Sequence, residues 1–521
     1  MADPIETLGY GVGRLLERPT RAAAVFLLGT LALAWLISAA RQYRHLRHFK
    51  GPPLAAVSKL WLLKTVGGQR AHLDFYETTR KYGPLARIGP NDILNDDPEL
   101  LRRMHGVRSD YRRSDWYDGM RFHPSKNNVF TWRDENEHQK LRSKMAAGYS
   151  GREVLGLEQK VDDNILRLCR LIEGYIDAGK PFDLGRKAQY FTLDVISDLA
   201  FGEPFGFVET DSDLYEYVQT TEDTLPLFLV TTVVPWVLKI FASPLFKSIL
   251  PSEHDPIGFG KVMGWVASHR WENIAKKFSA ERFGPNRKTQ PDMLGSFVAH
   301  GLNQEEAESE ILLQIIAGSD TSATAIRATL LHIITNPHVH ARLRAEIAAA
   351  TDASRPVISD ARARELPYLQ AVIKEGLRIF PPVAGLMAKE VPAGGDVWDG
   401  RFIPGGTRVG WSVWAMFRCE QTWGRDAEEF RPERWMLAED GEICASEEKL
   451  REMESVVDFV FSCGRYQCLG RPIAVMELNK IFFELLRRFD LNVCYPATPW
   501  KSINFGIHSQ SEFWVRASRR E

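Results

Sequence analysis

The sequence lacks the charge excess and the cysteine pattern that mark several classes of protein. Its 521 residues include 66 Lys and Arg against 67 Asp and Glu, which gives a formal net charge of -1. Binding to a phosphate backbone draws on a surplus of positive charge, so nucleic acid is not expected as a partner. Six cysteines without a Cys-x-x-Cys pair do not make a disulfide framework, a structural zinc site or a redox dithiol.

Motifs that bind nucleotides are also missing. No Gly-x-Gly-x-x-Gly follows a predicted strand, and no Walker-type loop occurs. A nicotinamide, flavin or nucleotide therefore has no visible cradle in the chain. Any electrons that the protein uses must come from a separate partner.

Helical periodicity dominates the body of the chain. Apolar residues recur at three- and four-residue spacing over residues 157–176, and Asn303 followed by Glu306 predicts the capped start of a long helix that reaches Thr335. Shorter β-like segments are predicted near residues 85–94, near residues 402–413 and at the carboxyl end. No repeat or long linker interrupts residues 61–521, so one large, mainly α domain with small β-sheets is expected there.

One long hydrophobic run lies near the amino end. Residues 22–40 carry no charge, and about 19 helical residues at ~1.5 Å each span ~28 Å, close to the hydrocarbon thickness of a bilayer. Cations follow the run, so we expect an uncleaved single-pass anchor with the body in the cytosol. A cleaved signal peptide is the alternative. Residues 1–21 would form a short tail and residues 41–60 a basic, Pro-rich hinge.

A second apolar stretch covers residues 225–246. Pro226, Pro235 and Pro244 interrupt it and Lys239 lies inside it, so a straight second membrane span is not expected. Prolines at this spacing suit short helices and turns. Either a hydrophobic lid near a substrate entrance or ordinary core helices would account for the composition.

The most informative segment is a loop near the carboxyl end that contains Cys468. It reads Phe461-Ser-Cys-Gly-Arg-Tyr-Gln-Cys-Leu-Gly470 and precedes a predicted helix. Gly464 and Gly470 allow backbone angles closed to other residues, so several N–H groups can converge on the sulfur, close to the positive end of the helix. Both effects favour a thiolate. An anionic sulfur with Phe461 as apolar cover could serve as the single axial ligand of an iron.

This loop resembles the haem-binding loop of the cytochrome P-450 family, the haem-thiolate monooxygenases. The family commonly has an arginine two residues before the cysteine, where this chain has Tyr466. In this respect the loop is similar to those of filamentous-fungal members related to pisatin demethylase. The resemblance implies the P-450 fold and a haem b cofactor, iron protoporphyrin IX, with Cys468 as the metal ligand. The other loop residues expected at the haem are Phe461, Gly464, Arg465 and Gly470, and whether Arg465 reaches a propionate is left open.

A glycine, an acid and an alcohol lie midway along the long helix that begins near Asn303. Gly318, Asp320 and Thr321 are poor choices for a helix interior without a further reason. They resemble the oxygen-activation segment of the family. The resemblance implies that the glycine leaves room for oxygen and that the acid-alcohol pair relays protons, which makes all three catalytic candidates.

Three further segments follow the layout of the family. Glu375 and Arg378 share one face of a predicted helix, and with Arg434 they resemble the family's Glu-Arg-Arg cluster, which implies a structural role. His138 and Arg142 lie one helical turn apart and are similar to the family's Trp-x-x-x-Arg helix, with His in the Trp position. These two residues are expected to contact the haem propionates, and Lys389 is a further candidate for that role.

The resemblance as a whole implies a membrane-bound monooxygenase, most simply of the endoplasmic reticulum. It would use O2, and electrons from NADPH through a separate NADPH-cytochrome P-450 reductase, to hydroxylate or otherwise oxidise a lipophilic small molecule. Similarity to the fungal branch implies secondary-metabolite biosynthesis, with detoxification of plant compounds as the alternative. By place in the layout, the candidate pocket walls are residues 109–130, 225–246, 315–323, 383–387 and 503–508.

Other functions explain less of the sequence. A haem-thiolate isomerase or dehydratase that needs no reductase commonly lacks the acid-alcohol pair, which this chain has in Asp320 and Thr321. A hydrolase with Cys468 as nucleophile would account neither for the glycine-flanked loop nor for the Glu-Arg-Arg cluster. A membrane-tethered binding module without haem is the third possibility.

Overall fold

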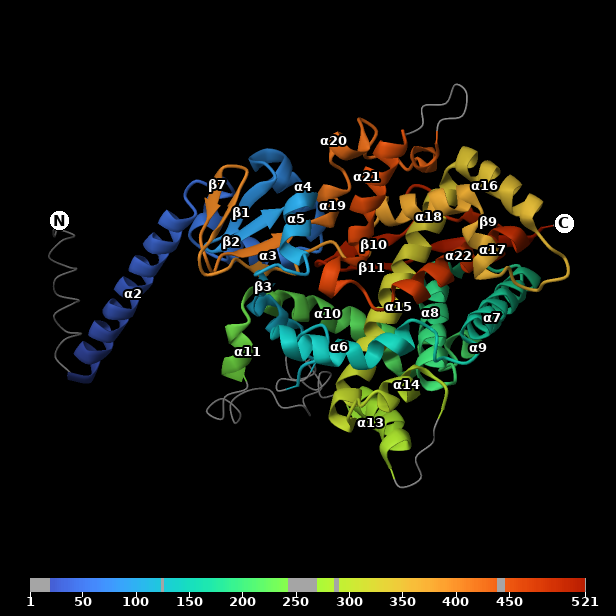
Figure 1. Ribbon diagram of the computed structural model, residues 1–521, viewed down its shortest axis with the longest axis horizontal. Coiled ribbons are helices and arrows are strands. Elements are labelled where there is room, and N and C mark those ends of the chain that lie inside the picture. The colour runs from blue at the N-terminus through green and yellow to red at the C-terminus, as the bar shows by residue number, and fades with distance from the viewer. Residues whose placement is uncertain (1–18, 123–125, 242–268, 285–289, 438–445, 521) are drawn as a thin grey trace, which may run out of the picture.

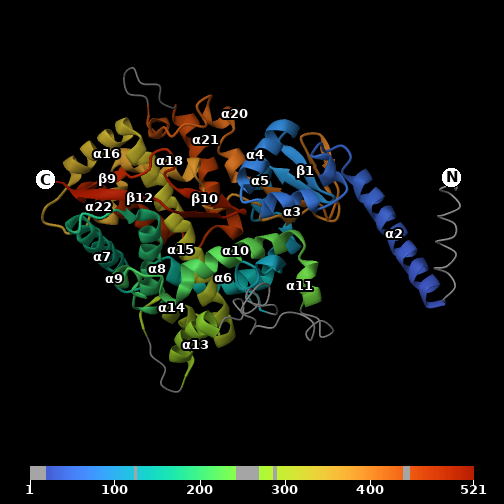
Figure 2. The same ribbon diagram turned by 180° about the vertical axis from the view of Figure 1, so that it is seen from behind.

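The computed structural model describes residues 19–122, 126–241, 269–284, 290–437 and 446–520. Helices form most of the body; β1 and β2 lie toward one end and the β10–β11 hairpin lies near its middle, while α2 (Pro19–His45) extends away from the end that contains β1 and β2 (Figure 1). The same arrangement is visible from behind (Figure 2). The prediction of a mainly α protein with small sheets is confirmed.

The helices that follow α2 are α3 (Leu60–Gly67), α4 (Ala71–Tyr82), α5 (Pro98–His105), α6 (Glu135–Tyr149), α7 (Leu157–Asp177), α8 (Leu184–Phe201), α9 (Phe207–Thr210), α10 (Tyr217–Val233), α11 (Trp236–Phe241), α13 (His269–Phe283), α14 (Met293–Ala299), α15 (Gln304–Thr335), α16 (Pro337–Ala350), α17 (Asp360–Arg364), α18 (Pro367–Ile379), α19 (Val413–Met416), α20 (Glu420–Trp423), α21 (Glu447–Val457) and α22 (Arg471–Arg488). The strands are β1 (Leu85–Gly89), β2 (Asp92–Asn95), β3 (Arg112–Arg113), β4 (Phe182–Asp183), β5 (Lys389–Glu390), β6 (Asp396–Trp398), β7 (Arg401–Ile403), β8 (Arg408–Trp411), β9 (Phe489–Val493), β10 (Lys501–Asn504), β11 (His508–Ser511) and β12 (Trp514–Arg519).

The sheets are small and bring distant parts of the chain together. The five-stranded sheet has the order β1-β2-β8-β5-β3, with β2 and β8 parallel and the other neighbours antiparallel. β3 pairs with β5 so that Arg113 lies opposite Lys389. The three-stranded sheet has the order β4-β12-β9, and β10 and β11 form a hairpin. The strands predicted near residues 85–94, near residues 402–413 and at the carboxyl end are therefore present.

α15 is the long helix that the capping residues predicted. Asn303 accepts a hydrogen bond from the Glu306 backbone N–H at 2.9 Å, and the Glu306 carboxylate accepts one from the Asn303 N–H at 2.9 Å. This reciprocal cap satisfies two N–H groups that the first turn leaves without partners. The helix ends at Thr335, directly before Asn336-Pro337, because a proline disfavours helical angles in the residue before it.

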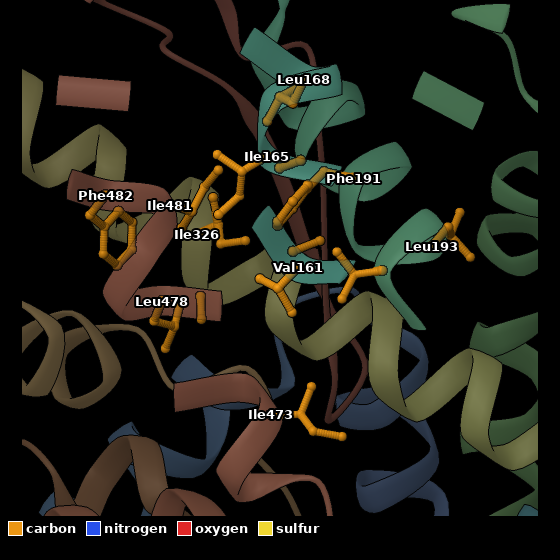
Figure 3. Close-up of a cluster of buried hydrophobic side chains, with 14 of the residues drawn as sticks. Val161, Ile165, Leu168, Phe191, Leu193, Ile326, Ile473, Leu478, Ile481 and Phe482 are labelled. Atoms are coloured by element: carbon orange, nitrogen blue, oxygen red, sulfur yellow. The ribbon is translucent and has the colours of Figure 1, made fainter. Parts of the chain in front are cut away.

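The largest hydrophobic core lies where α7, α8, α15 and α22 meet. Figure 3 shows apolar side chains from all four helices converging on one another. The labelled residues are Val161, Ile165, Leu168, Phe191, Leu193, Ile326, Ile473, Leu478, Ile481 and Phe482. Because α22 starts directly after the cysteine loop, this core fixes the position of the loop against α15.

The apolar run near the amino end is helical. α2 includes residues 22–40 and exposes several large apolar side chains, among them Phe26, Leu28 and Leu33. Over the described residues, the structure has no helix whose length and mean hydropathy meet the requirement for crossing a bilayer.

α10 and α11 form the described part of the second apolar stretch. α10 continues through Pro226, while Pro235 separates it from α11. The expected break at a proline is thus present at Pro235 and wrong at Pro226, where the helix instead lacks the hydrogen bond that a proline cannot donate. Leu229 and Val233 are buried, so this part of the stretch packs into the body. Pro244 lies outside the described residues.

Candidate haem site

The loop from Phe461 to Gly470 takes a fixed shape that depends on one of its two glycines. Gly464 has a φ of 61°, and a Cβ there would overlap the backbone oxygen of His105. Gly470 has ordinary helical angles, with φ -76° and ψ -2°, and acts as the N-cap of α22. The expectation of unusual backbone angles is therefore correct for Gly464 and wrong for Gly470. A side chain at Gly470 would instead begin 3.8 Å from the Cys468 sulfur.

The surface of the Cys468 side chain is accessible to water, although the body of the protein surrounds the loop that carries it. Its backbone N–H donates to the Phe461 carbonyl at 2.8 Å. Burial raises the pKa of the Cys468 thiol, while the N–H groups of Gly470 and Arg471 and the Arg142 charge act in the opposite direction. The expected stabilisation of a thiolate is thus present but is outweighed by desolvation in the protein alone. A metal ion that coordinates a thiol deprotonates it outright.

Tyr466 occupies the place two residues before the cysteine and lies among cations. Its hydroxyl donates to the Glu135 carboxylate, at the start of α6. The Lys389 ammonium lies 3.7 Å from the centre of the Tyr466 ring, and the Arg113 guanidinium lies 4.7 Å from it. Arg465 pairs with the same Glu135 at 3.4 Å. The Tyr466 ring therefore packs the cysteine loop against the buried cations Lys389 and Arg113.

The cations near this loop have few counter-charges. Arg142 is half-buried and is without a hydrogen bond or ion pair among the residues that the structure describes. His138 is buried, and its Nδ1 has no partner there. Burial and the surrounding cations lower the pKa of His138 to about 3. Burial also lowers the pKa of Lys389 to about 7, and its ammonium donates to the Met104 carbonyl at 3.0 Å.

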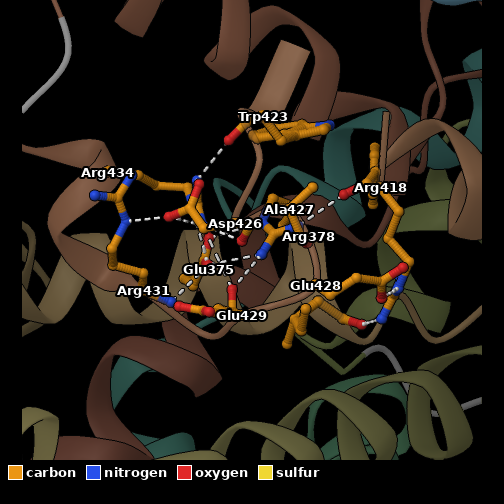
Figure 4. Close-up of polar contacts among 12 residues, drawn as sticks. Glu375, Arg378, Arg418, Trp423, Asp426, Ala427, Glu428, Glu429, Arg431 and Arg434 are labelled. Carbon is orange, nitrogen blue, oxygen red and sulfur yellow. Dashed lines mark hydrogen bonds and ion pairs between the residues drawn. The ribbon is translucent and has the colours of Figure 1, made fainter. Parts of the chain in front are cut away.

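The Glu-Arg-Arg residues form one buried polar cluster (Figure 4). The Glu375 carboxylate accepts from Arg378 at 2.8 Å through both oxygens and from Arg434 at 3.0 Å. It also accepts from the Arg431 backbone at 2.8 Å and from the Trp435 indole at 2.9 Å. Burial raises the pKa of Glu375, but the two guanidinium groups outweigh it and hold the pKa below its ordinary value. The structure therefore brings the three predicted residues together.

The polar residues of α15 face two different sides of the helix. The Thr321 hydroxyl donates to the Ala317 carbonyl at 2.8 Å, and both Ala317 and the Thr321 hydroxyl are exposed in the middle of the helix. Asp320 instead contacts α8 and α10, where Gln189 and Tyr217 donate to its two oxygens. A helix interior accepts this residue because both oxygens of its carboxylate are hydrogen-bonded.

Gly318 has a packing role that the sequence did not indicate. A Cβ at this position would lie 2.8 Å from the Ile196 side chain of α8. The missing side chain therefore lets α15 and α8 approach closely. Its expected place beside an oxygen site stays a prediction.

Sequence reasoning missed several residues of this site. Arg113 carries no motif and is found only because β3 pairs with β5. Glu135 holds both Arg465 and Tyr466, but an acid in the first turn of a helix looks like an ordinary favourable charge. Gln189 and Tyr217 lie in the segment between residues 150 and 300, where the sequence offers only helical periodicity.

The comparisons with known proteins agree with this geometry. Residues 50–512 match the family model described as Cytochrome P450. The chain therefore belongs to the cytochrome P450 family, and the prediction of a P450 monooxygenase is confirmed.

The relatives are fungal. "Cytochrome P450 monooxygenase ABA1" of Pyricularia oryzae is 41% identical, over 96% of this chain and 98% of the relative. "Cytochrome P450 monooxygenase pkfB" of Emericella nidulans is 32% identical, over 92% of each chain. The solved structure described as "Crystal structure of cytochrome P450DA heme domain" covers 91% of this chain and 98% of its own, with a TM-score of 0.71 at 18% identity. That likeness establishes a shared fold.

Proposed function

We propose that the protein is a haem-thiolate monooxygenase with Cys468 as the axial ligand of the iron. The observation that carries this proposal is the exposed Cys468 thiol in a loop shaped by Gly464. Two features of the structure fit a haem. The absence of a side chain at Gly470 keeps the volume beside the sulfur open. The Arg142 guanidinium and the His138 Nδ1, which have no partner within the described part of the chain, suit two propionates.

Different residues of the site would bind the iron and the propionates of the haem. Cys468 would bind the iron, while Arg142, His138 and Lys389 would bind the propionates. Arg465 is engaged with Glu135 and the Val107 carbonyl. Its contribution would thus be to hold the loop against α6, rather than to contact a propionate. Phe461 would cover the sulfur, and the Arg471 guanidinium lies 5.4 Å from the centre of its ring.

The bound haem supplies oxygen activation, which electron donation from a thiolate ligand favours. The chain would supply protons and orientation. Thr321 presents its hydroxyl on the exposed side of α15. Asp320 directly precedes it in the chain and contacts α10, and this acid would return a proton to the Thr321 hydroxyl. Glu375, Arg378 and Arg434 form a buried polar cluster and would keep the fold rigid.

The substrate would be a lipophilic small molecule of fungal secondary metabolism. Four of the predicted pocket segments, residues 109–130, 225–246, 383–387 and 503–508, contribute to one apolar cluster. Its members include Trp116, Met120, Leu229, Leu386 and Phe505. Apolar walls with few polar groups suit a hydrophobic ligand. Detoxification of a plant compound would use the same walls.

A separate NADPH-cytochrome P450 reductase would supply the electrons. The chain has no nucleotide-binding motif of its own, and the cations Arg102 and Arg471 lie near the cysteine loop with about a third of their side chains exposed. We also propose that α2 associates with a membrane, most simply of the endoplasmic reticulum. Apolar side chains are exposed along α2, and the helix itself extends away from the body (Figure 1); both observations support this proposal.

The ligand assignment can be tested by absorption spectroscopy of the reduced, carbon-monoxide-bound protein. The wild type should show the red-shifted band that gives the family its name, and Cys468→Ser should abolish it. Cys463→Ser is the matched control, because it lies in the same loop, is half-buried and should leave the band unchanged. An unaltered spectrum in Cys468→Ser would refute the assignment. Conversion of a hydroperoxide without reductase would favour an isomerase or dehydratase.

A further inference from the structure

Asp320 is held by side chains from two other helices. The Tyr217 hydroxyl, in α10, lies 3.1 Å from one carboxylate oxygen of Asp320 and 3.0 Å from the Ser319 hydroxyl. The Gln189 amide, in α8, donates to the other oxygen. Both oxygens therefore point toward α8 and α10, on a different side of α15 from the exposed Ala317 and Thr321 hydroxyl.

Gln189 links this carboxylate to a buried cation. Its amide oxygen accepts from Arg327 at 2.5 Å, and Arg327 also donates to the Gln510 carbonyl at 2.5 Å. The guanidinium is fully enclosed, with only 4% of Arg327 exposed. A hydrogen-bonded amide between a carboxylate and a guanidinium is polarised by both charges, so it holds Asp320 more firmly than a neutral pair would.

A small cavity lies beside Asp320. Its lining comes from α8, α10, α15 and the β10–β11 hairpin, and includes Gln189, Glu222, Asp320 and His508. The space open to the centre of a water molecule is about 20 Å³, and one ordered water needs roughly 10–15 Å³ by this measure. Thr221 also lines the cavity, is 5% exposed, and its hydroxyl has no partner among the described residues. A buried polar group without a protein partner indicates an ordered water.

The cavity leads from the carboxylate toward the surface. Glu222 forms a two-pronged pair with Arg186 at 2.9 and 3.0 Å, and about a quarter of each side chain is exposed. Asp320 lies at the inner side of the same cavity. The cavity therefore extends from Glu222, which water can reach, to Asp320, the acid of the predicted proton relay.

The charged and titratable groups around Asp320 come from every element packed against it. They are Arg327 on α15, Arg186 on α8, Tyr217 and Glu222 on α10, and His508 on β11. Burial raises the pKa of Asp320 to about 6, although Gln189, Arg327 and Tyr217 each lower it. Burial also lowers the pKa of His508 well below its ordinary value. The His508 imidazole packs against the rings of His72, Phe380 and Trp414, so it takes no part in the proton transfer.

We propose that Tyr217 and Gln189 are positioning residues that hold Asp320 against this cavity, and that water in the cavity exchanges protons between Asp320 and solvent near Glu222. The proposal deepens the proposed function, on which it rests. It identifies the side of α15 from which the acid-alcohol pair is supplied with protons. Each transfer passes one proton along existing hydrogen bonds and requires no further reactant.

The test follows the Asp320 carboxyl by infrared difference spectroscopy of the resting, haem-loaded full chain. The carbonyl stretch of protonated Asp320 is assigned by its loss in Asp320→Asn. Tyr217→Phe removes a donor to the carboxylate and should move the titration midpoint upward by about one to two pH units, the size of a lost hydrogen bond to a charged group. Tyr190→Phe is the matched control, because it is a buried tyrosine of α8 with no hydrogen bond to Asp320. The control should leave the midpoint unchanged.

The cavity is tested separately by the exchange of the Asp320 proton for deuterium after mixing with heavy water. Thr221→Val keeps the size and shape of the side chain, removes the hydroxyl that lines the cavity, and should slow this exchange several-fold. It should also raise the hydrogen peroxide released per product several-fold. An unchanged midpoint in Tyr217→Phe, or unchanged exchange in Thr221→Val, overturns the proposal. The carbon-monoxide spectrum of each variant reports independently on the haem, so failure of the proposed function is distinguishable.

Discussion

Neutralising Glu375 should destabilise the protein far more than neutralising the residue next to it. In Glu375→Gln the amide keeps the shape of the side chain, but it removes the negative charge between Arg378 and Arg434. Arg434 retains Asp426, whose carboxylate lies 3.2 Å away. Arg378 is fully buried, and its other hydrogen-bond acceptors among the described residues are the uncharged backbone carbonyls of Phe417, Ala427 and Glu429. An unpaired buried charge costs about 3–5 kcal/mol.

The matched control is Lys374→Gln, on the same helix. Lys374 pairs with Glu454, and their side chains are 35% and 42% exposed. Water screens such a pair, so its loss should cost at most about 1 kcal/mol. The assay is urea unfolding of the detergent-solubilised chain, followed by tryptophan fluorescence and haem absorbance. Equal losses of unfolding free energy in the two variants would refute the account of this cluster.

Two further variants test other buried positions. Glu310 is buried and its pKa is raised to about 8. Between about pH 4.5 and pH 8 this carboxyl is ionised in the unfolded chain but protonated in the folded protein, so the free energy of unfolding should fall by up to ~1.4 kcal/mol per pH unit as pH rises. Glu310→Gln should remove this loss. The control is Glu308→Gln, because Glu308 lies on the same helix as Glu310 and forms a partly exposed pair with Lys126; it should not remove the loss. Identical pH profiles of unfolding in the two variants would contradict the raised pKa. Gly318→Ala places a Cβ 2.8 Å from Ile196 and should destabilise by about 1–3 kcal/mol. The control Gly174→Ala adds a Cβ that meets no atom within 4 Å, so it should stabilise the protein slightly. A shift of the thermal unfolding midpoint in the same direction in both variants would contradict the packing role of Gly318.

Much of the fold could be predicted because the signals were local. The capping pair Asn303 and Glu306 marks the start of α15, and Pro337 marks its end. Of the five-stranded sheet, β1, β2 and β8 were predicted in place, whereas the two-residue strands β3 and β5 were not. The order of the strands was not predicted either, because β2 pairs with β8, and β3 with β5, through residues hundreds of positions apart. Pro226 shows the limit of proline as a signal, since burial of α10 outweighs one lost hydrogen bond.

The site was predictable where a motif fixes several residues at once. Cys468 and the Glu375 cluster were found for this reason. The effect of Tyr466 was not, since its contacts with Arg113, Lys389 and Glu135 come from three separate elements. The partners of Asp320 were missed because Gln189 and Tyr217 stand out neither by spacing nor by composition. Hydrogen bonds across helices leave little trace in a single sequence.

The pairing of β12 with β4 sets the order in which this chain can complete its core during synthesis. Asp183 is the last residue of β4, an edge strand of the three-stranded sheet, yet its partner Phe513 lies 330 residues further along. Phe182 and Val515, opposite each other in that sheet, both belong to the largest hydrophobic core. A ribosome must therefore release nearly the whole polypeptide before this core can close. Deletions confined to β12 should consequently yield chains that chaperones retain, even with every residue of the cysteine loop intact.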